Sequence, residues 1–187
     1  MTEVLRAAIE AQSVFDRQDW KSCVIGGVAL VRWGEPRETV DVDLTLLTGF
    51  GDETKFVEEL LRHFDARVPD PLQFALANRV VLLRTKSGVG LDVALGALPF
   101  EESMVARSSY YDFPTGRIRT CSAEDLIVMK SFAGRTKDWA DVEGIILRQR
   151  GKLDWAYVFD QLRPLADLKG APELVAELER RRDILGR

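Results

Sequence analysis

Two acidic residues separated by one apolar residue, Asp41 and Asp43, offer the clearest chemistry in this sequence. They lie in the stretch 40–47, where valines and leucines alternate with Asp41, Asp43 and Thr45. This alternation of period two is typical of a half-buried β-strand, so both carboxylates should project from one face, ~7 Å apart. Like charges this close repel unless a cation lies between them, and carboxylate oxygens suit Mg²⁺. The motif therefore predicts a metal site, or else a pair of solvated acids on an exposed strand.

A third acid, Asp92, lies in a mostly apolar segment further along the chain. Residues 79–85 and 89–95 are rich in valine and leucine and are separated by the turn residues 86–88, which predicts a β-hairpin. In the second strand Leu91, Val93 and Leu95 share one face and Asp92 points to the other. Asp92 joins the predicted metal site only if its strand lies beside that of Asp41 and Asp43, and otherwise it is an ordinary exposed acid.

A pair of glycines, Gly26 and Gly27, follows a short apolar run at residues 22–25 and precedes a helical pattern at 28–33. The order predicts a strand, a Gly-Gly turn and a helix. Such a turn lets backbone N–H groups approach a phosphate at the N-terminus of a helix. It could equally be a tight connection that needs small residues.

The elements that must hold these residues in place can be predicted from periodicity. Helices are expected at 3–18 and 53–64, and a second hairpin or two short strands within 107–121. The segment 65–77 is mixed, with Pro69 and Pro71 as breakers. Residues 122–125 form a capping box that opens a helix with Lys130 off its apolar stripe. A second helix begins near Asp138 and Asp141, where acids suit the helix dipole. Two further helices are expected at 154–166 and 172–184.

Composition excludes some classes of protein. The 187 residues are 46% hydrophobic and 30% charged, with a net charge of −4, so the chain as a whole is no basic nucleic-acid binder. Residues 130–187 carry a small basic excess, which suits a nucleotide or simply a solvated helical surface. Cys23 and Cys121 lack metal-ligand spacing and are expected to be reduced. No apolar run approaches the ~20 residues of a membrane span and no signal-peptide pattern is present, so we expect a cytoplasmic protein.

Taken in order, Gly26-Gly27, Asp41-Val42-Asp43 and Asp92 resemble the nucleotidyltransferase superfamily that includes DNA polymerase beta. More closely, the chain resembles the AbiEii-type toxin nucleotidyltransferases. Three stretches carry this likeness: G-G-V-A-L at 26–30, R-E-T-V-D-V-D-L at 37–44, and K-S-F-A-G-R-T-K-D-W-A-D at 130–141.

The resemblance implies an α+β fold, a mixed β-sheet with helices packed on it and a helical C-terminal part. It implies a nucleotidyltransferase domain at 1–150 and a C-terminal helical extension at 151–187, packed on the same domain. The implied reaction moves a nucleoside monophosphate from a nucleoside triphosphate to an acceptor hydroxyl. Two Mg²⁺ ions would be held by Asp41, Asp43 and Asp92, and Asp92 would also help to deprotonate the acceptor.

The resemblance also implies roles for other residues. Gly26 and Gly27 would offer N–H groups to the triphosphate, and Lys130 would contact its phosphates or the leaving pyrophosphate. Further residues implied near the nucleotide are Arg37, Thr39, Arg135, Lys137, Asp138 and Asp141. Asp138 and Asp141 would either hold the Lys130 region in place or touch the substrate.

The chain departs from the families in two ways. The commoner superfamily turn is Gly-Ser, although the AbiEii-type family accepts Gly-Gly. The chain is also shorter than full-length AbiEii-type toxins, which leaves the acceptor and a toxin activity open. RNA such as tRNA, a protein hydroxyl and a small molecule all remain possible acceptors, and an antitoxin remains a possible partner.

Two other functions compete with this interpretation. D-V-D-L-T also matches the opening motif of haloacid-dehalogenase-like phosphatases, in which the first Asp is a nucleophile at the C-terminal end of a strand. A catalytically inactive nucleotidyltransferase fold could also serve as a binding module. A Ser–His–Asp hydrolase is disfavoured because the only histidine, His63, lies in a helical pattern.

Overall fold

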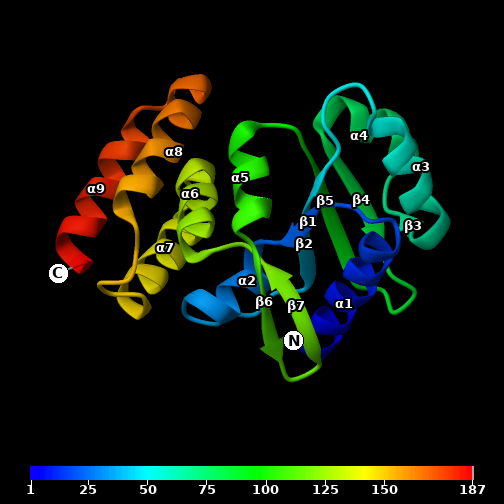
Figure 1. Cartoon of the computed structure of the whole chain (residues 1–187), viewed down its shortest axis with the longest axis horizontal. Coiled ribbons are helices and arrows are strands. Elements are labelled where there is room, and N and C mark those ends of the chain that lie inside the picture. Colours follow the sequence, from blue (N-terminus) through cyan, green and yellow to red (C-terminus); the bar gives the residue numbers. More distant parts are fainter. Residues whose placement is uncertain (187) are drawn as a thin grey trace. The chain divides into compact units, whose positions relative to one another are not determined.

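The computed structural model describes residues 1–186, and its strands form one seven-stranded mixed sheet in the order β3-β4-β5-β2-β1-β7-β6 (Figure 1). The strands are β1 (Ser22–Val24), β2 (Asp41–Leu47), β3 (Asp65–Ala66), β4 (Val80–Arg84), β5 (Gly90–Gly96), β6 (Ser109–Phe113) and β7 (Gly116–Thr120). With its helices, this sheet confirms the predicted α+β fold.

The centre of the sheet is the parallel pair β2 and β5, flanked by the antiparallel strands β1 and β4. Val42, Leu44 and Leu46 of β2 are buried, whereas Asp41 and Asp43 are half-buried on the other face. β5 shows the same alternation around Asp92. The period-two pattern of the sequence therefore sorts each strand into a core face and a face that carries the acids.

Four helices accompany the sheet: α1 (Thr2–Arg17), α3 (Glu53–His63), α4 (Pro71–Asn78) and α5 (Pro99–Arg107). α1 is the predicted amphipathic helix, and its buried stripe packs against β1, β2 and β7. The mixed segment at 65–77 contains β3 and all of α4 but its last residue, and the expectation that Pro71 acts as a breaker was wrong. Pro71 stands in the first turn of α4, where backbone N–H groups have no acceptor within the helix. The missing N–H of proline therefore costs nothing there, and Pro71 begins the helix and does not break it.

The chain divides into two compact units. Unit 1 comprises Met1–Ala29 and Glu38–Cys121, and therefore holds the whole sheet. Unit 2 comprises Leu30–Arg37 and the chain from Ser122 onward. Helix α2 (Gly26–Trp33) runs from the first unit into the second.

Unit 2 is built around helix α6 (Ala123–Ala133), which packs against α7 (Thr136–Arg148), α8 (Trp155–Lys169) and α9 (Glu173–Leu185). α8 and α9 also pack on each other (Figure 1). The predicted domain boundary at residue 150 falls inside this unit, between α7 and α8, and that functional division stays a prediction. Within residues 1–186 no helix combines the length and apolarity that a membrane span requires.

The Gly-Gly pair differs in one respect from the expected turn. α2 begins at Gly26 itself, not at residue 28, so both glycines belong to its first turn. Gly26 has a φ of 60°, a left-handed conformation that glycine adopts without strain. This residue turns the chain from β1 directly into the helix.

Candidate active site

Three acids meet on one face of the sheet in unit 1. In the parallel register of β2 and β5, Asp43 lies opposite Asp92, and Asp41 lies opposite Gly90. Partners in register share a face, so Asp41, Asp43 and Asp92 all project on the same side. The condition that the sequence left open for Asp92, that its strand lie beside the D-x-D strand, is thereby met.

The first turn of α2 lies against Asp43. A Cβ atom built on Gly26 would come within 1.9 Å of Oδ2 of Asp43, so only glycine leaves room for the carboxylate there. A Cβ atom on Gly27 would come within 2.7 Å of Oγ1 of Thr39, whose hydroxyl donates a hydrogen bond to the carbonyl of Asp41 at 3.1 Å. Five of the predicted site residues are thus linked by close pairwise contacts.

Asp92 is paired with an arginine that the sequence did not suggest. Nη2 of Arg67 donates a hydrogen bond to Oδ1 of Asp92. Burial raises the pKa of Asp92, the positive charge of Arg67 opposes that effect, and the negative charge of Asp41 adds to it. Asp92 is thus a carboxylate with a raised pKa that is held by one guanidinium.

These acids suit Mg²⁺ in donor chemistry, because carboxylate oxygens are its preferred protein ligands. Asp41 and Asp43 share one face of the sheet, so both can direct carboxylate oxygens to a cation on that side. Among residues 1–186, however, no three Asp, Glu, His or Cys side chains are grouped so that they could hold a metal ion. The predicted three-acid metal centre therefore stays a prediction.

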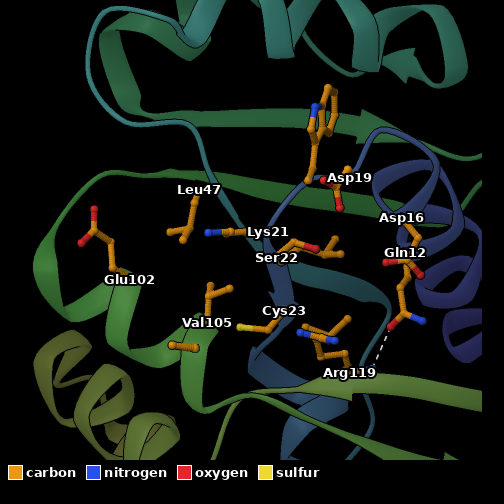
Figure 2. Close-up of a pocket in the computed structure, with 14 residues that line it drawn as sticks. Gln12, Asp16, Asp19, Lys21, Ser22, Cys23, Leu47, Glu102, Val105 and Arg119 are labelled. Carbon is orange, nitrogen blue, oxygen red and sulfur yellow. Dashed lines mark hydrogen bonds between the residues drawn. The ribbon is translucent and has the colours of Figure 1, made fainter.

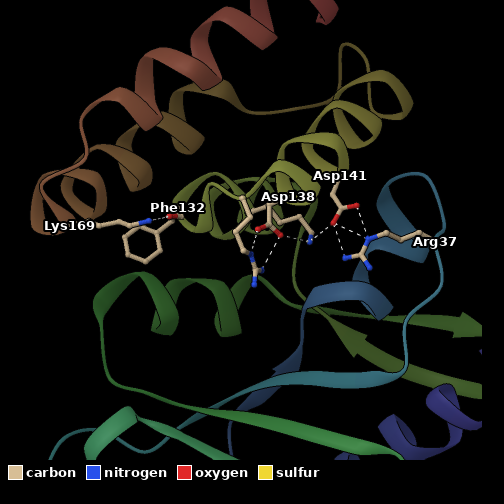
Figure 3. A network of polar contacts seen from close by, with 7 residues as sticks. Arg37, Phe132, Asp138, Asp141 and Lys169 are labelled. Atoms are coloured by element: carbon tan, nitrogen blue, oxygen red, sulfur yellow. Dashed lines mark hydrogen bonds and ion pairs between the residues drawn. The ribbon is translucent and has the colours of Figure 1, made fainter.

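Apart from Lys137, the predicted residues of unit 2 form a second cluster, which Figure 3 shows. Lys130 is buried, and its Nζ lies 2.6 Å from Oδ2 of Asp141 and 3.4 Å from Oδ1 of Asp138. Arg37 donates from Nε to Oδ1 of Asp141 at 2.9 Å and from Nη2 to Oδ2 at 3.1 Å. Arg135 donates from Nε to Oδ2 of Asp138 at 2.5 Å.

The charges of this cluster stabilise one another. Burial opposes the ionisation of Asp138, but the hydrogen bond from Arg135 and the charge of Lys130 outweigh it and lower the pKa of Asp138. Lys130 is only 7% exposed, so both of its acidic partners neutralise a charge that has left water. Lys137 is exposed on the first turn of α7. Contacts of Lys130 and Lys137 with phosphate stay a prediction.

A cavity of about 750 Å³ lies elsewhere in unit 1, around β1. Figure 2 shows Gln12 and Asp16 of α1 on one side of Ser22 and Cys23, and Glu102 and Val105 of α5 on the other. None of the predicted site residues is among those that line this cavity. We place the candidate site at the acids because their chemistry, and not the volume of a hollow, suits a defined reaction.

Sequence reasoning missed Arg67, which directly follows the two-residue strand β3. Its backbone N–H donates to the carbonyl of Leu82 at 2.9 Å and so extends the β3–β4 pairing. A lone arginine before Pro69 in an irregular segment carries no pattern. Only the pairing of β3 with β4 brings it to the acids.

Residues 3–166 match the model of a family described as nucleotidyltransferase of unknown function (DUF6036). Comparison with curated proteins gives no match. Among solved structures, an antigenic nucleotidyltransferase-like protein from Paracoccidioides brasiliensis is similar, with 19% identity and a TM-score of 0.53 over 92% of this chain and 89% of that one. The lincomycin-bound lincosamide antibiotic adenylyltransferase LnuA is similar with 13% identity and a TM-score of 0.50, over 72% of this chain and 91% of that one. At these identities the two likenesses concern the fold.

Proposed function

The chain belongs to the family described as nucleotidyltransferase of unknown function (DUF6036), and we propose accordingly that it transfers a nucleoside monophosphate from a nucleoside triphosphate to a hydroxyl group. The observation that carries this proposal is the register of β2 and β5. It sets Asp92 opposite Asp43 and beside Asp41, next to the N-terminus of α2. The finer likeness to AbiEii-type toxins stays a prediction.

The acids have distinct roles in this proposal. Asp41 and Asp43 would hold Mg²⁺, with Asp92 completing the ligand set, and two ions are expected. When bound, Mg²⁺ would neutralise the charge that grows on the oxygens of the reacting phosphate. The carboxylate of Asp92 would accept the proton of the acceptor hydroxyl, and a raised pKa suits a general base.

The nucleotide would bind through its triphosphate at the start of α2. The backbone N–H groups of Gly26 and Gly27 lie in the first turn of this helix, where they and the helix dipole favour an anion. Thr39 lies against Gly27 and would add a hydroxyl to the same site.

The cluster around Lys130 supports a positioning role in this proposal. Its ammonium is shared between Asp138 and Asp141, and Arg135 and Arg37 bind these two acids from outside. A buried ammonium that already pairs with two carboxylates is poorly placed to bind the phosphates of a substrate as well. We therefore assign Asp138 and Asp141 to holding α6 and α7 in place.

The acceptor is the open part of the proposal. An RNA end, a protein hydroxyl and a small molecule are all compatible with a reaction that needs only a nucleophilic oxygen. LnuA is described as an antibiotic adenylyltransferase, so small-molecule hydroxyls belong among the acceptors to be offered. An antitoxin partner is expected only if the AbiEii-type likeness extends to function.

The test offers each α-labelled nucleoside triphosphate with Mg²⁺ to cell extract and identifies the labelled product as RNA, protein or small molecule. Asp43→Asn should abolish labelling, because it removes a charge that the metal and the transferred phosphate need. Asp52→Asn is the matched control, since Asp52 is an exposed acid of the same unit that pairs with the exposed Lys55. Undiminished labelling by a folded Asp43→Asn protein would contradict the site.

Two alternatives give different outcomes in this assay. A binding module would bind nucleotide with Mg²⁺ and release no pyrophosphate. A dehalogenase-like phosphatase would turn over a phosphoester without any nucleotide. The structure disfavours the phosphatase, since β2 begins at Asp41 and runs on through Leu47, whereas the nucleophile of that family follows its strand.

A further inference from the structure

The guanidinium of Arg67 lies over the acids. Nη2 of Arg67 binds Oδ1 of Asp92, and a Cβ atom built on Gly90 would be 3.1 Å from Nη1 of Arg67 and 3.5 Å from the Cβ of Asp41. Gly90 is the register partner of Asp41. Because the β5 residue next to Asp41 has no side chain, the guanidinium occupies the space beside Asp41 and reaches Asp92 from there.

The backbone directs Arg67 to this place. Its N–H donates to the carbonyl of Leu82, and Leu82 is the register partner of Asp92 on β4. The side chain therefore reaches over β4 to β5. Both partners are mostly withdrawn from solvent, with 23% of the Arg67 side chain and 33% of the Asp92 side chain exposed.

This ion pair competes with a metal for the same carboxylate. An oxygen that accepts a hydrogen bond from a guanidinium directs its lone pair at that group, and a divalent cation beside a guanidinium would meet strong like-charge repulsion. Among residues 1–186, the buried Nε of Arg67 meets no hydrogen-bond partner, so the arginine is incompletely satisfied in this position. A metal ion that displaces this guanidinium from Asp92 therefore breaks fewer hydrogen bonds than it would if the guanidinium were fully bonded.

We propose that Arg67 is an internal counter-ion of Asp92, and that a divalent metal binds Asp92 only when Arg67 leaves it. The register brings Asp92 beside Asp41 and Asp43, and Arg67 neutralises the Asp92 carboxylate there. This pairing makes Arg67 a residue that sets the metal affinity of the candidate site. This inference rests on the proposed function, since it takes the three acids as metal ligands.

The experiment measures Mn²⁺ binding to the whole chain without nucleotide, with free Mn²⁺ counted by electron paramagnetic resonance. Arg67→Gln should bind Mn²⁺ about threefold tighter than the unchanged protein, the size expected when one partly exposed ion pair no longer competes. Arg62→Gln is the matched control, because Arg62 belongs to the same unit and pairs with Glu59 on the exposed side of α3. This control should leave Mn²⁺ affinity unchanged.

Further variants separate failure of the inference from failure of the proposed function. In an Asp92→Asn background, Arg67→Gln should have no further effect on Mn²⁺ affinity. If Asp43→Asn abolishes Mn²⁺ binding but Arg67→Gln leaves it unchanged or weakens it, the acids bind metal and the counter-ion role is overturned. If Asp43→Asn also leaves Mn²⁺ binding unchanged, the metal site itself is wrong.

A measurement on the unchanged protein covers the case in which Arg67→Gln does not fold. The Nε–Hε signal of Arg67 in ¹⁵N NMR, assigned with Arg67→Lys, should shift as Mg²⁺ is added. A signal that stays still while the acids bind Mg²⁺ would contradict displacement.

Discussion

At the scale of single residues, the two adjacent positions 26 and 27 require glycine for different physical reasons. Gly26 combines a φ of 60° with a carboxylate where its side chain would be, while Gly27 leaves space for Thr39. A serine Cβ at position 27 would come within 2.7 Å of the Thr39 hydroxyl oxygen. The threonine occupies space that a serine at position 27 would need.

The role of Gly26 can be tested against a glycine of similar conformation. Gly49 has a φ of 70° and nothing within 4 Å of a Cβ built on it. Gly49→Ala should lower the free energy of unfolding by about 1 kcal/mol, from the left-handed backbone alone. Gly26→Ala should lower it by a further ~1–3 kcal/mol because it also overpacks against Asp43. Urea unfolding of both variants measures the difference.

An Asp43→Ala background provides the check on this explanation. It removes Cγ and Oδ2, the two atoms that the new methyl group would meet first. The excess loss of Gly26→Ala over Gly49→Ala should then shrink. Equal losses in the two single variants would show that conformation and not contact determines the requirement for glycine.

At the scale of elements, helices α6 and α7 are joined by buried charge. Lys130 was expected to lie off the apolar stripe of its helix, and it lies instead among the buried residues of α6. The local pattern misplaced it because α6 packs against three other helices, so burial extends beyond one stripe. Asp138 lies in the first turn of α7, where the dipole argument places an acid, whereas Asp141 lies one turn further along, and both are partners of Lys130.

We expect Lys130→Met to destabilise the protein by about 2 kcal/mol, because Asp138 and Asp141 lose their shared buried cation but keep their arginine partners. Lys152→Met is the control, since Lys152 is exposed in the turn before α8. It should change the free energy of unfolding by less than about 0.5 kcal/mol. Equal stability of the two variants in denaturant titrations would show that the cluster does not stabilise unit 2.

The lowered pKa of Asp138 predicts a pH dependence. Because this pKa lies below the ordinary value of 3.8, the unfolded chain binds more protons near that pH than the folded chain does. The stability that ionised Asp138 contributes is therefore complete above 3.8 and is lost as the pH falls through the lower, folded value. Asp138→Asn should be less stable than the unchanged protein at pH 7, and the gap should close below pH 3.8. A gap that is constant with pH in urea titrations would contradict this assignment.

At the scale of the whole molecule, the two compact units are interleaved along the chain. Leu30–Arg37 leaves the first unit and joins the second, and the chain returns to the second unit at Ser122. In unit 2, α8 and α9 cover α6, and the buried Asp125 accepts a hydrogen bond from the Tyr157 hydroxyl at 2.6 Å. A cut at residue 150 therefore passes through a packed core.

A chain of residues 1–150 should not keep unit 2 folded. It loses Tyr157 and the apolar side chains of α8 that bury α6, so Asp125 and several apolar residues of α6 become exposed. Circular dichroism should show less helix than residues 1–150 form in the whole chain. Addition of the peptide 151–187 in trans should restore that helix. Cooperative unfolding of the fragment at the temperature of the whole chain would instead support the expected boundary.

Local features of the chain were predictable because they depend on neighbours in sequence. The alternation around Asp41 and Asp43 predicted their strand and their shared face, and the 3.6-residue periodicity predicted α1, α3 and the C-terminal helices. The prediction that Pro71 interrupts regular structure was wrong because the effect of a proline depends on whether it begins a helix or lies inside it.

Only the tertiary structure decided which groups meet. The register that sets Asp92 opposite Asp43 joins residues 49 positions apart, and Arg37 meets Asp141 across 104 positions. The pairing of Arg67 with Asp92 depends on β3 adding to β4, a contact of two residues without a pattern of its own. Periodicity shows which face a side chain takes, but its partner across the sheet follows from strand order and register, which long-range packing determines.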